Sequence, residues 1–122
     1  MPLTGIARVS TETILLCSSS PGYLRSLGNL IIGYSAFNQD LVGSHSLVIG
    51  DGHAWTGAGA LVVGSGHTVS ADGAVAIGGM GNTASGNAAV VIGGSGSTAG
   101  HALSTVLNSP GAATSAPMES VY

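Results

Sequence analysis

Charged side chains are scarce in this sequence of 122 residues, of which only 6% are Asp, Glu, Lys or Arg. Ordinary soluble domains contain about 25% charged residues. Because Arg8 and Arg25 are its two basic residues, the chain cannot neutralise a run of phosphates, and nucleic-acid binding is excluded. Hydrophobic residues make up 44% of the chain. We therefore expect part of its surface to be covered by other copies of itself.

Cysteine and long apolar runs are equally scarce. Cys17 is the single cysteine, so it forms no internal disulfide, and no metal-ligand spacing surrounds it. We expect it to be a buried apolar residue, as free cysteines usually are. No apolar run reaches the roughly 18 residues of a membrane-spanning helix, and the start at Met1-Pro2-Leu3 does not resemble a signal peptide. The sequence therefore predicts no transmembrane segment in this chain.

Glycine, by contrast, is abundant, with 21 residues, and much of it recurs at a regular interval. Apolar runs that end in glycine occupy residues 30–33, 47–50, 61–64, 75–78 and 90–93, and a weaker run ends at Asn108. The closing glycines lie 14 to 17 residues apart. Such a period predicts a stack of near-identical units.

A second repeated block lies between the apolar runs and alternates polar with apolar residues. Its best copies are residues 68–70, 83–85 and 98–100. Alternation of this kind indicates a strand with one face in water. The residues that we expect to point outward, and that form a candidate binding surface, are Thr68, Ser70, Thr83, Ser85 and Thr98.

The glycine-closed runs are apolar on both alternating faces and therefore need cover on both. We expect one face, with Leu47 and Ile49 and their counterparts, to fill the interior of the coil. The other face would then meet further copies around a symmetry axis. The residues expected in that core between chains are Val48, Val62, Ala76 and Val91.

The repeat divides the chain into three parts. Residues 28–108 form the repeat domain. Residues 1–27 lack the repeat, and their pattern predicts a short strand at 13–17 followed by a turn at 18–22. We interpret them as an N-terminal cap or an attachment segment. Residues 109–122 are small and contain prolines, which predicts a flexible C-terminal tail.

Residues 73–78 and 82–86, which read Gly-Ala-Val-Ala-Ile-Gly and Asn-Thr-Ala-Ser-Gly, resemble the head domain of trimeric autotransporter adhesins, the YadA-like head. The resemblance covers residues 28–108. It implies an all-β, left-handed β-roll (solenoid) whose coils have about 14 residues, packed as a homotrimer. It also implies an adhesive module at an extracellular or bacterial cell surface, with a host matrix protein or a cell-surface ligand as partner.

Two other functions remain open beside adhesion. The same roll could serve as a structural part of a phage or other fibre. The column Thr68, Thr83 and Thr98 is also compatible with ice binding, although earlier coils carry Asp40 and Ala54 in that column.

The acidic and serine residues do not form a catalytic pattern. Asp40, Asp51 and Asp72 occupy different positions in different coils, and Ser65 and Ser95 lie at joints that recur with the period. We therefore expect no catalytic residues, no cofactor and no metal, and we interpret the chain as non-enzymatic. An enzyme acting across chain interfaces is the remaining alternative.

His53 and His67 occupy equivalent positions in adjacent coils, in a column that elsewhere holds Gln39, Asn82 and Ser97. Because its polar residues are interchangeable, we interpret this column as a solvated ladder of turns. A zinc site, the alternative, would need one or two more ligands, which an adjacent chain could supply. Trp55 shares a column with inward-facing Leu41, Val69, Ala84 and Ala99. We expect it to plug the wide end of the roll, with an exposed ligand contact as the alternative.

Overall fold

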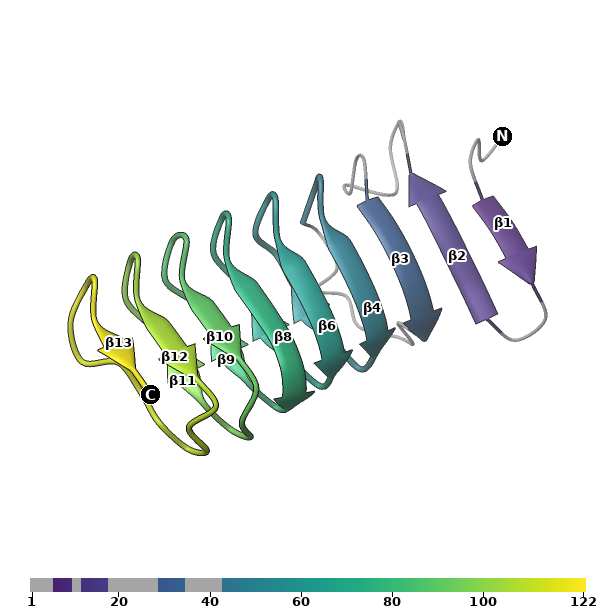
Figure 1. The fold of residues 1–122 in the computed structure, drawn as a ribbon. Coiled ribbons are helices and arrows are strands. Elements are labelled where there is room, and N and C mark those ends of the chain that lie inside the picture. The colour runs from purple at the N-terminus through teal and green to yellow at the C-terminus, as the bar shows by residue number, and fades with distance from the viewer. Residues whose placement is uncertain (1–5, 10–11, 18–28, 35–42) are drawn as a thin grey trace.

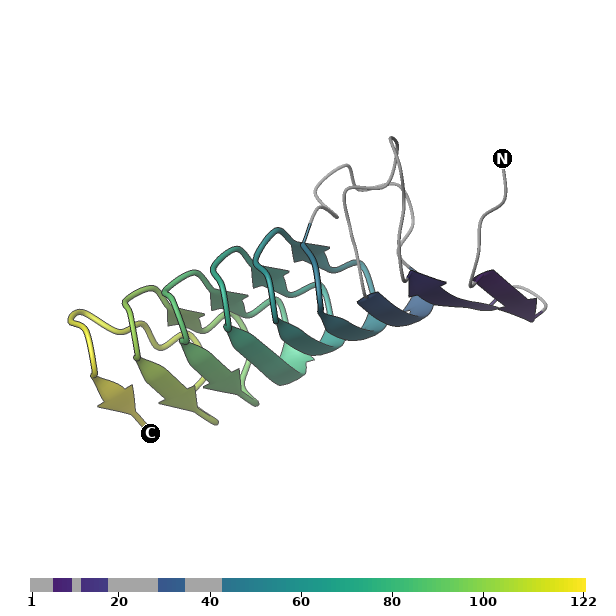
Figure 2. The ribbon, with the colours of Figure 1, turned by 90° about the horizontal axis from the view of Figure 1, so that it is seen from above.

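The computed structural model describes residues 6–9, 12–17, 29–34 and 43–122. All regular secondary structure within these residues is β, and the chain winds into a parallel β-solenoid. From residue 47 to residue 99 each coil adds one strand to a nine-stranded sheet and one to a four-stranded sheet (Figure 1). Figure 2 shows the two sheets as layers on opposite sides of the coil.

The strands of the larger sheet are long enough to form its continuous wall. In spatial order they are β1 (Ile6–Val9), β2 (Glu12–Cys17), β3 (Asn29–Tyr34), β4 (Leu47–Asp51), β6 (Leu61–Ser65), β8 (Val75–Met80), β10 (Val90–Ile92), β12 (Thr105–Leu107) and β13 (Ser120–Val121). The smaller sheet consists of the two-residue strands β5 (Ala54–Trp55), β7 (Thr68–Val69), β9 (Thr83–Ala84) and β11 (Thr98–Ala99).

Pairing in register, one coil to the next, confirms the repeat. Leu47 pairs with Leu61, Leu61 with Val75, and Val75 with Val90, all in parallel strands. Equivalent residues therefore stack into columns that run the length of the solenoid. Strands stack about 4.8 Å apart, so each column presents one side chain per coil at that spacing.

The N-terminal strands extend the larger sheet beyond the first coil. β1 and β2 pair antiparallel, β2 pairs antiparallel with β3, and the parallel pairing begins at β3 and β4. The strand expected at residues 13–17 is thus confirmed as part of β2. The expected turn at 18–22 lies outside the described residues, and the interpretation of residues 1–27 as a cap or attachment segment stays a prediction.

The expectation of a flexible tail at residues 109–122 is wrong, because this segment forms another coil. β13 pairs in parallel with β12, and Ala113 forms a bridge with Thr98. The amide of Thr105 donates to the Glu119 carbonyl at 2.8 Å. This coil has no glycine-closed apolar run, so its backbone pairing with the preceding coil, rather than its composition, defines it.

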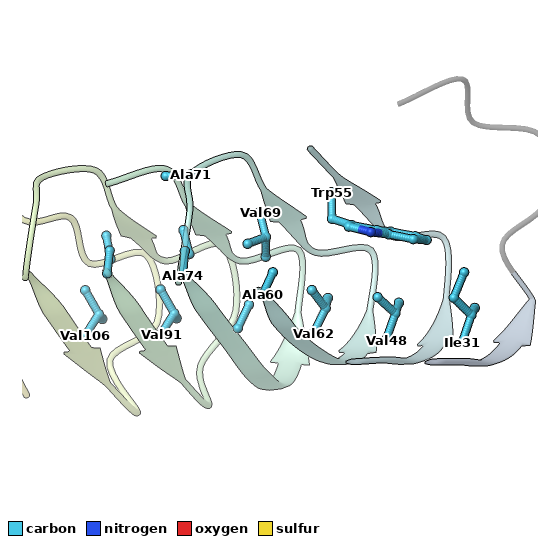
Figure 3. Close-up of a cluster of buried hydrophobic side chains, with 14 residues drawn as sticks. Ile31, Val48, Trp55, Ala60, Val62, Val69, Ala71, Ala74, Val91 and Val106 are labelled. Carbon is cyan, nitrogen blue, oxygen red and sulfur yellow. The ribbon is translucent and has the colours of Figure 1, made fainter. Parts of the chain in front are cut away.

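One residue from each of β3, β4, β6, β8, β10 and β12 lines the interior of the solenoid, and Figure 3 shows most of them pointing inward. Val48, Val62, Ala76 and Val91 are at most 1% exposed within a single chain, as is Val106 in β12. They belong to the same buried cluster as Trp55, Val69, Ala84 and Ala99 of the smaller sheet.

The expectation that Val48, Val62, Ala76 and Val91 form a core between chains is therefore wrong. The alternation of side chains sorts the residues of each strand into two sets, as expected. The set that faces inward contains one residue of each strand, which is the second residue in β4, β6, β8 and β10. The flanking apolar residues, such as Leu47 and Ile49, are the ones left partly exposed.

Candidate binding surfaces

An apolar surface covers the outer side of the larger sheet. We call it the apolar face and define it by Leu47, Ile49, Leu61, Val63, Val75, Ile77, Val90 and Ile92. Every member is at least partly exposed, and Ile92 is 42% exposed. No member is charged or polar. A parallel sheet that is apolar on both faces usually has both faces covered, and within one chain only the inner face of this sheet is covered.

A hydroxyl surface covers the outer side of the smaller sheet. We call it the hydroxyl face and define it by Thr68, Ser70, Thr83, Ser85 and Thr98. The two serines and Thr68 are exposed, and the other two threonines are half-buried. Thr68 pairs with Thr83, and Thr83 with Thr98, so the hydroxyl groups are stacked coil on coil. All five residues therefore lie outside the core, on one side of the solenoid.

Trp55 lies inside the solenoid and is 0% exposed, which agrees with its interpretation as a plug and excludes an exposed ligand contact in this chain. Gly43 makes room for the indole, because a Cβ at Gly43 would lie 2.4 Å from the Trp55 Cδ1. The indole Nε1 has no hydrogen-bond partner among the described residues. Leu41, the expected neighbour in this column, lies outside them.

His53 and His67 are also inside the solenoid, so their interpretation as part of a solvated ladder is wrong. They belong to a buried polar column with Asn82 and Ser97, and all four residues are at most 2% exposed. Each of the first three side chains accepts a hydrogen bond from the backbone amide of the next member. The N–H of His67 donates to Nδ1 of His53 at 3.2 Å, that of Asn82 to Nδ1 of His67 at 3.1 Å, and that of Ser97 to Oδ1 of Asn82 at 2.9 Å. The column thus satisfies backbone amides that would otherwise be unpaired in the core.

The two imidazole rings stack on each other, with centroids 5.3 Å apart and planes inclined by 16°. Nδ1 of His53 accepts a hydrogen bond from the His67 N–H, so it carries no proton of its own. The ring proton is therefore on Nε2, which donates to the Ile49 carbonyl at 3.1 Å. Nε2 of His67 has no hydrogen-bond partner among the described residues. In both rings Nδ1 thus acts as a hydrogen-bond acceptor.

The electrostatics of His67 favour its neutral form. Burial lowers its pKa below the ordinary value, and the neighbouring His53 lowers it further, while the Val63 backbone acts in the opposite direction.

A spacing in the sequence could have identified this column as buried. Each polar member follows a glycine by three residues, as in Gly50 and His53, and a Cβ on that glycine would press on the polar side chain. The pairs are Gly50 with His53, Gly64 with His67, Gly79 with Asn82 and Gly94 with Ser97, with separations of 2.4 to 3.1 Å. The glycines thus provide the space that polar side chains need inside the coil.

A second internal column begins at Asn29, whose role the sequence did not reveal. Its Oδ1 accepts from the Ser46 amide at 2.8 Å, and the Ser46 hydroxyl accepts from the Ala60 amide at 3.1 Å. Asn29 also donates from Nδ2 to the Gly43 carbonyl at 2.7 Å. Buried polar side chains in this solenoid therefore serve to join one coil to the next.

The remaining candidate residues lie apart from one another. Asp51, Asp72 and His45 are exposed, and Asp72 accepts from the Ala58 amide at 2.9 Å in a turn. His101 is half-buried beside Thr114. Asp40 lies outside the described residues. In the part of the chain that the structure describes, no three His, Cys, Asp or Glu residues are grouped to hold a metal ion, and no helix is long and apolar enough to cross a membrane.

No protein-family model, curated protein or solved structure significantly matches this chain.

Proposed function

We propose that this chain is a non-enzymatic adhesive module of the YadA-like head type. In this proposal three left-handed solenoids pack through their apolar faces at a cell surface and present their hydroxyl faces to a host matrix protein or a cell-surface ligand. The observation that carries the proposal is the uncovered apolar face of a sheet whose other face already forms the core of the chain.

The size of the larger sheet supports its use as an interface between chains. It contains nine strands, and at about 4.8 Å per strand and roughly three to five residues per strand its face measures roughly 400–700 Å². A standard protein interface buries about 800 Å² from each partner. The sheet therefore offers roughly half to nine-tenths of that area, and the apolar face occupies four of its nine strands.

A second copy of the chain is the occupant that the apolar face fits best. The face has no charged or polar member with which to select a partner by charge or hydrogen bonding. Its aliphatic side chains recur once per coil. A second copy of the chain carries the same side chains at the same spacing, so two such faces match coil by coil. Closed cyclic symmetry covers every such face and leaves none to nucleate aggregation.

The hydroxyl face then points away from the trimer axis, because the two sheets lie on opposite sides of the coil (Figure 2). An uncharged ladder of hydroxyl groups offers repeated hydrogen-bond donors and acceptors. Such a surface suits a partner that is itself extended and repetitive, as matrix proteins are.

Two measurements test this proposal separately. Sedimentation equilibrium should give three times the monomer mass; a monomer at all accessible concentrations would contradict the trimer. Retention on a layer of extracellular matrix should fall when Thr68, Thr83 and Thr98 are all changed to valine, which preserves shape and removes the hydroxyl groups. Unchanged retention, with the wild-type fold and mass, would exclude the hydroxyl face as the adhesive surface.

Ice binding is a second candidate, favoured by the in-register stacking of Thr68, Thr83 and Thr98 on one side of the solenoid. The ladder is bounded by Ala54 at one end and Ala113 at the other, so its flat part is short. Thermal hysteresis measured at millimolar protein decides between the candidates, because adhesion predicts none.

A further inference from the structure

The buried polar column changes its chemistry along the solenoid. In the coils that contain β5 and β7 its members are His53 and His67, whereas in the next two coils they are Asn82 and Ser97. All four are buried, but only the two histidines have a titratable side chain. The titratable part of the column is therefore confined to two adjacent coils, next to Trp55.

We propose that the stacked pair His53 and His67 is an acid-sensitive latch, so that proton uptake by these rings opens the coils around β5 and β7 while the later coils remain closed. The proposal goes beyond adhesion and does not depend on it, because it concerns the interior of a single chain.

The hydrogen bonds of the pair leave no place for an added proton. Nδ1 of His53 and Nδ1 of His67 each accept from a backbone N–H of the following coil, at 3.2 and 3.1 Å. A protonated ring donates from both nitrogens, so it would direct an N–H at another N–H. The ring must then leave the column, and the backbone amide of His67 or Asn82 loses its partner in the core.

The described strands around the rings offer little to compensate a positive charge. The strands packed around them are β4 to β9, and among these β4 contributes Asp51, which is exposed at the end of the strand. β5, β6, β7, β8 and β9 contain no Asp, Glu, Lys or Arg. Asp72, in the turn before β8, is exposed and bonded to the Ala58 amide. Among the residues that the structure describes, the charged neighbour that each ring would meet is therefore the other ring, 5.3 Å away.

Proton linkage gives the expected size of the effect. The opened coils bind protons with the ordinary histidine pKa of about 6.5. Below that pH the opening constant should rise about tenfold per pH unit if one proton is taken up, and about 100-fold if both rings take one. Burial keeps the pKa of His67 low in the closed state, so the rise continues until the closed state itself binds protons.

Asn82 shows which substitution provides a control for the two histidines. Asn82 occupies the same column, and its Oδ1 accepts from the Ser97 amide at 2.9 Å, as the ring nitrogens do for their neighbours. The double variant H53N/H67N therefore keeps an acceptor at each position and removes the titrating groups. Any acid sensitivity that comes from Asp or Glu residues remains in this variant.

The experiment is amide hydrogen exchange by NMR on the full chain between pH 7.5 and 4.5, at one protein concentration, with rates corrected for intrinsic exchange. The opening constants for the amides of His67 and Asn82 should rise tenfold to 100-fold per pH unit below about pH 6.5. Those for the buried amides of Val91 and Val106 should not. In H53N/H67N the rise should disappear. The fluorescence of Trp55, the single tryptophan, should report the same transition.

Several results would overturn the latch. It is excluded if the opening constants for the amides of His67 and Asn82 are independent of pH, if the double variant shows the same slope, or if the later coils open equally. If the double variant does not fold, NMR titration of the two rings in the wild-type chain decides instead. Rings that titrate near pH 6.5 while the coils stay closed would contradict the proposal, and rings that stay neutral until the coils open would support it.

Discussion

His67 lies directly against Gly64, so closely that a Cβ at Gly64 would be 2.4 Å from Nε2 of the imidazole. The glycine has φ of 136°, a conformation that other residues rarely adopt. Gly64 therefore ends the apolar run of β6 for two reasons: it turns the backbone, and it leaves space for a buried ring.

Replacing Gly64 by alanine should destabilise the fold strongly. The added methyl group would meet the ring of His67, and the backbone would be strained, which together should cost roughly 2–5 kcal/mol in the free energy of unfolding. Denaturant unfolding followed by circular dichroism measures this loss.

Gly66→Ala is the matched control for this prediction, because Gly66 also has positive φ, at 65°, but its Cβ would meet nothing closer than 3.9 Å. It should cost only the backbone strain, about 1–2 kcal/mol. Serine already occupies this column at Ser97. Changing His67 to serine should therefore reduce the loss of unfolding free energy that Gly64→Ala causes. An equal penalty with and without the ring would show that the contact is unimportant.

Adjacent residues of β6 should respond differently to the same charge. Val62 is 0% exposed in the interior, and Val62→Asp should unfold the chain, because an unpaired carboxylate would lie in the core. Val63 lies on the apolar face, and Val63→Asp should preserve the coil but weaken association between chains. Circular dichroism and sedimentation equilibrium separate the two outcomes.

Thr83→Asp on the hydroxyl face is the control, and it should leave both fold and mass unchanged. A Val63→Asp variant that keeps the full oligomeric mass would place the interface elsewhere.

The stacking of coils could be predicted from the sequence, but the inner side of the strand could not. Glycine-closed runs such as 47–50 and 61–64 set the period, and the period sets the parallel register of Leu47 with Leu61. Alternation then separates Val48 from Ile49 without saying which faces inward, since both are aliphatic. That choice depends on where the corners lie, which only the folded coil determines.

The burial of His53 and His67 was missed for a related reason. Sequence reasoning treats a column of His, Asn and Ser as polar and therefore solvated. In the structure the partners of these side chains are backbone amides one coil away, such as the Asn82 amide that donates to His67. The glycine three residues earlier is the signal that distinguishes this buried column from an exposed one.

Removing the indole of Trp55 should leave a large cavity between the sheets. Trp55 is 0% exposed, and its ring fills space that smaller residues, Val69 and Ala84, fill in the following coils. Trp55→Ala should cost about 3–5 kcal/mol in the free energy of unfolding, measured by denaturant titration.

Ala60→Gly provides a mild comparison for Trp55→Ala, because it removes one methyl group from the same buried cluster. If Trp55→Ala costs no more than Ala60→Gly, the indole does not support the coils around it.

The place of an insertion should matter more than its length. β8 already contains one more residue than β6, and the register shifts between Val63 and Ser65 to absorb it. The extra residue lies in Gly78-Gly79-Met80, at the joint, and Met80 still pairs with Ser65. Adding one glycine between Gly64 and Ser65 should therefore only move this shift to the pairing of β4 with β6.

One residue added between Val75 and Ala76 would act differently, because it would reverse the side to which every later residue of the strand points. Ala76 would move out of the interior and a residue of the apolar face would move in. We expect this variant to be unfolded, whereas the joint variant should keep a cooperative thermal transition within a few degrees of wild type, as a cost of about 1 kcal/mol or less would produce. Equal tolerance of both insertions would mean that Val62, Ala76 and Val91 are not held inward by alternation.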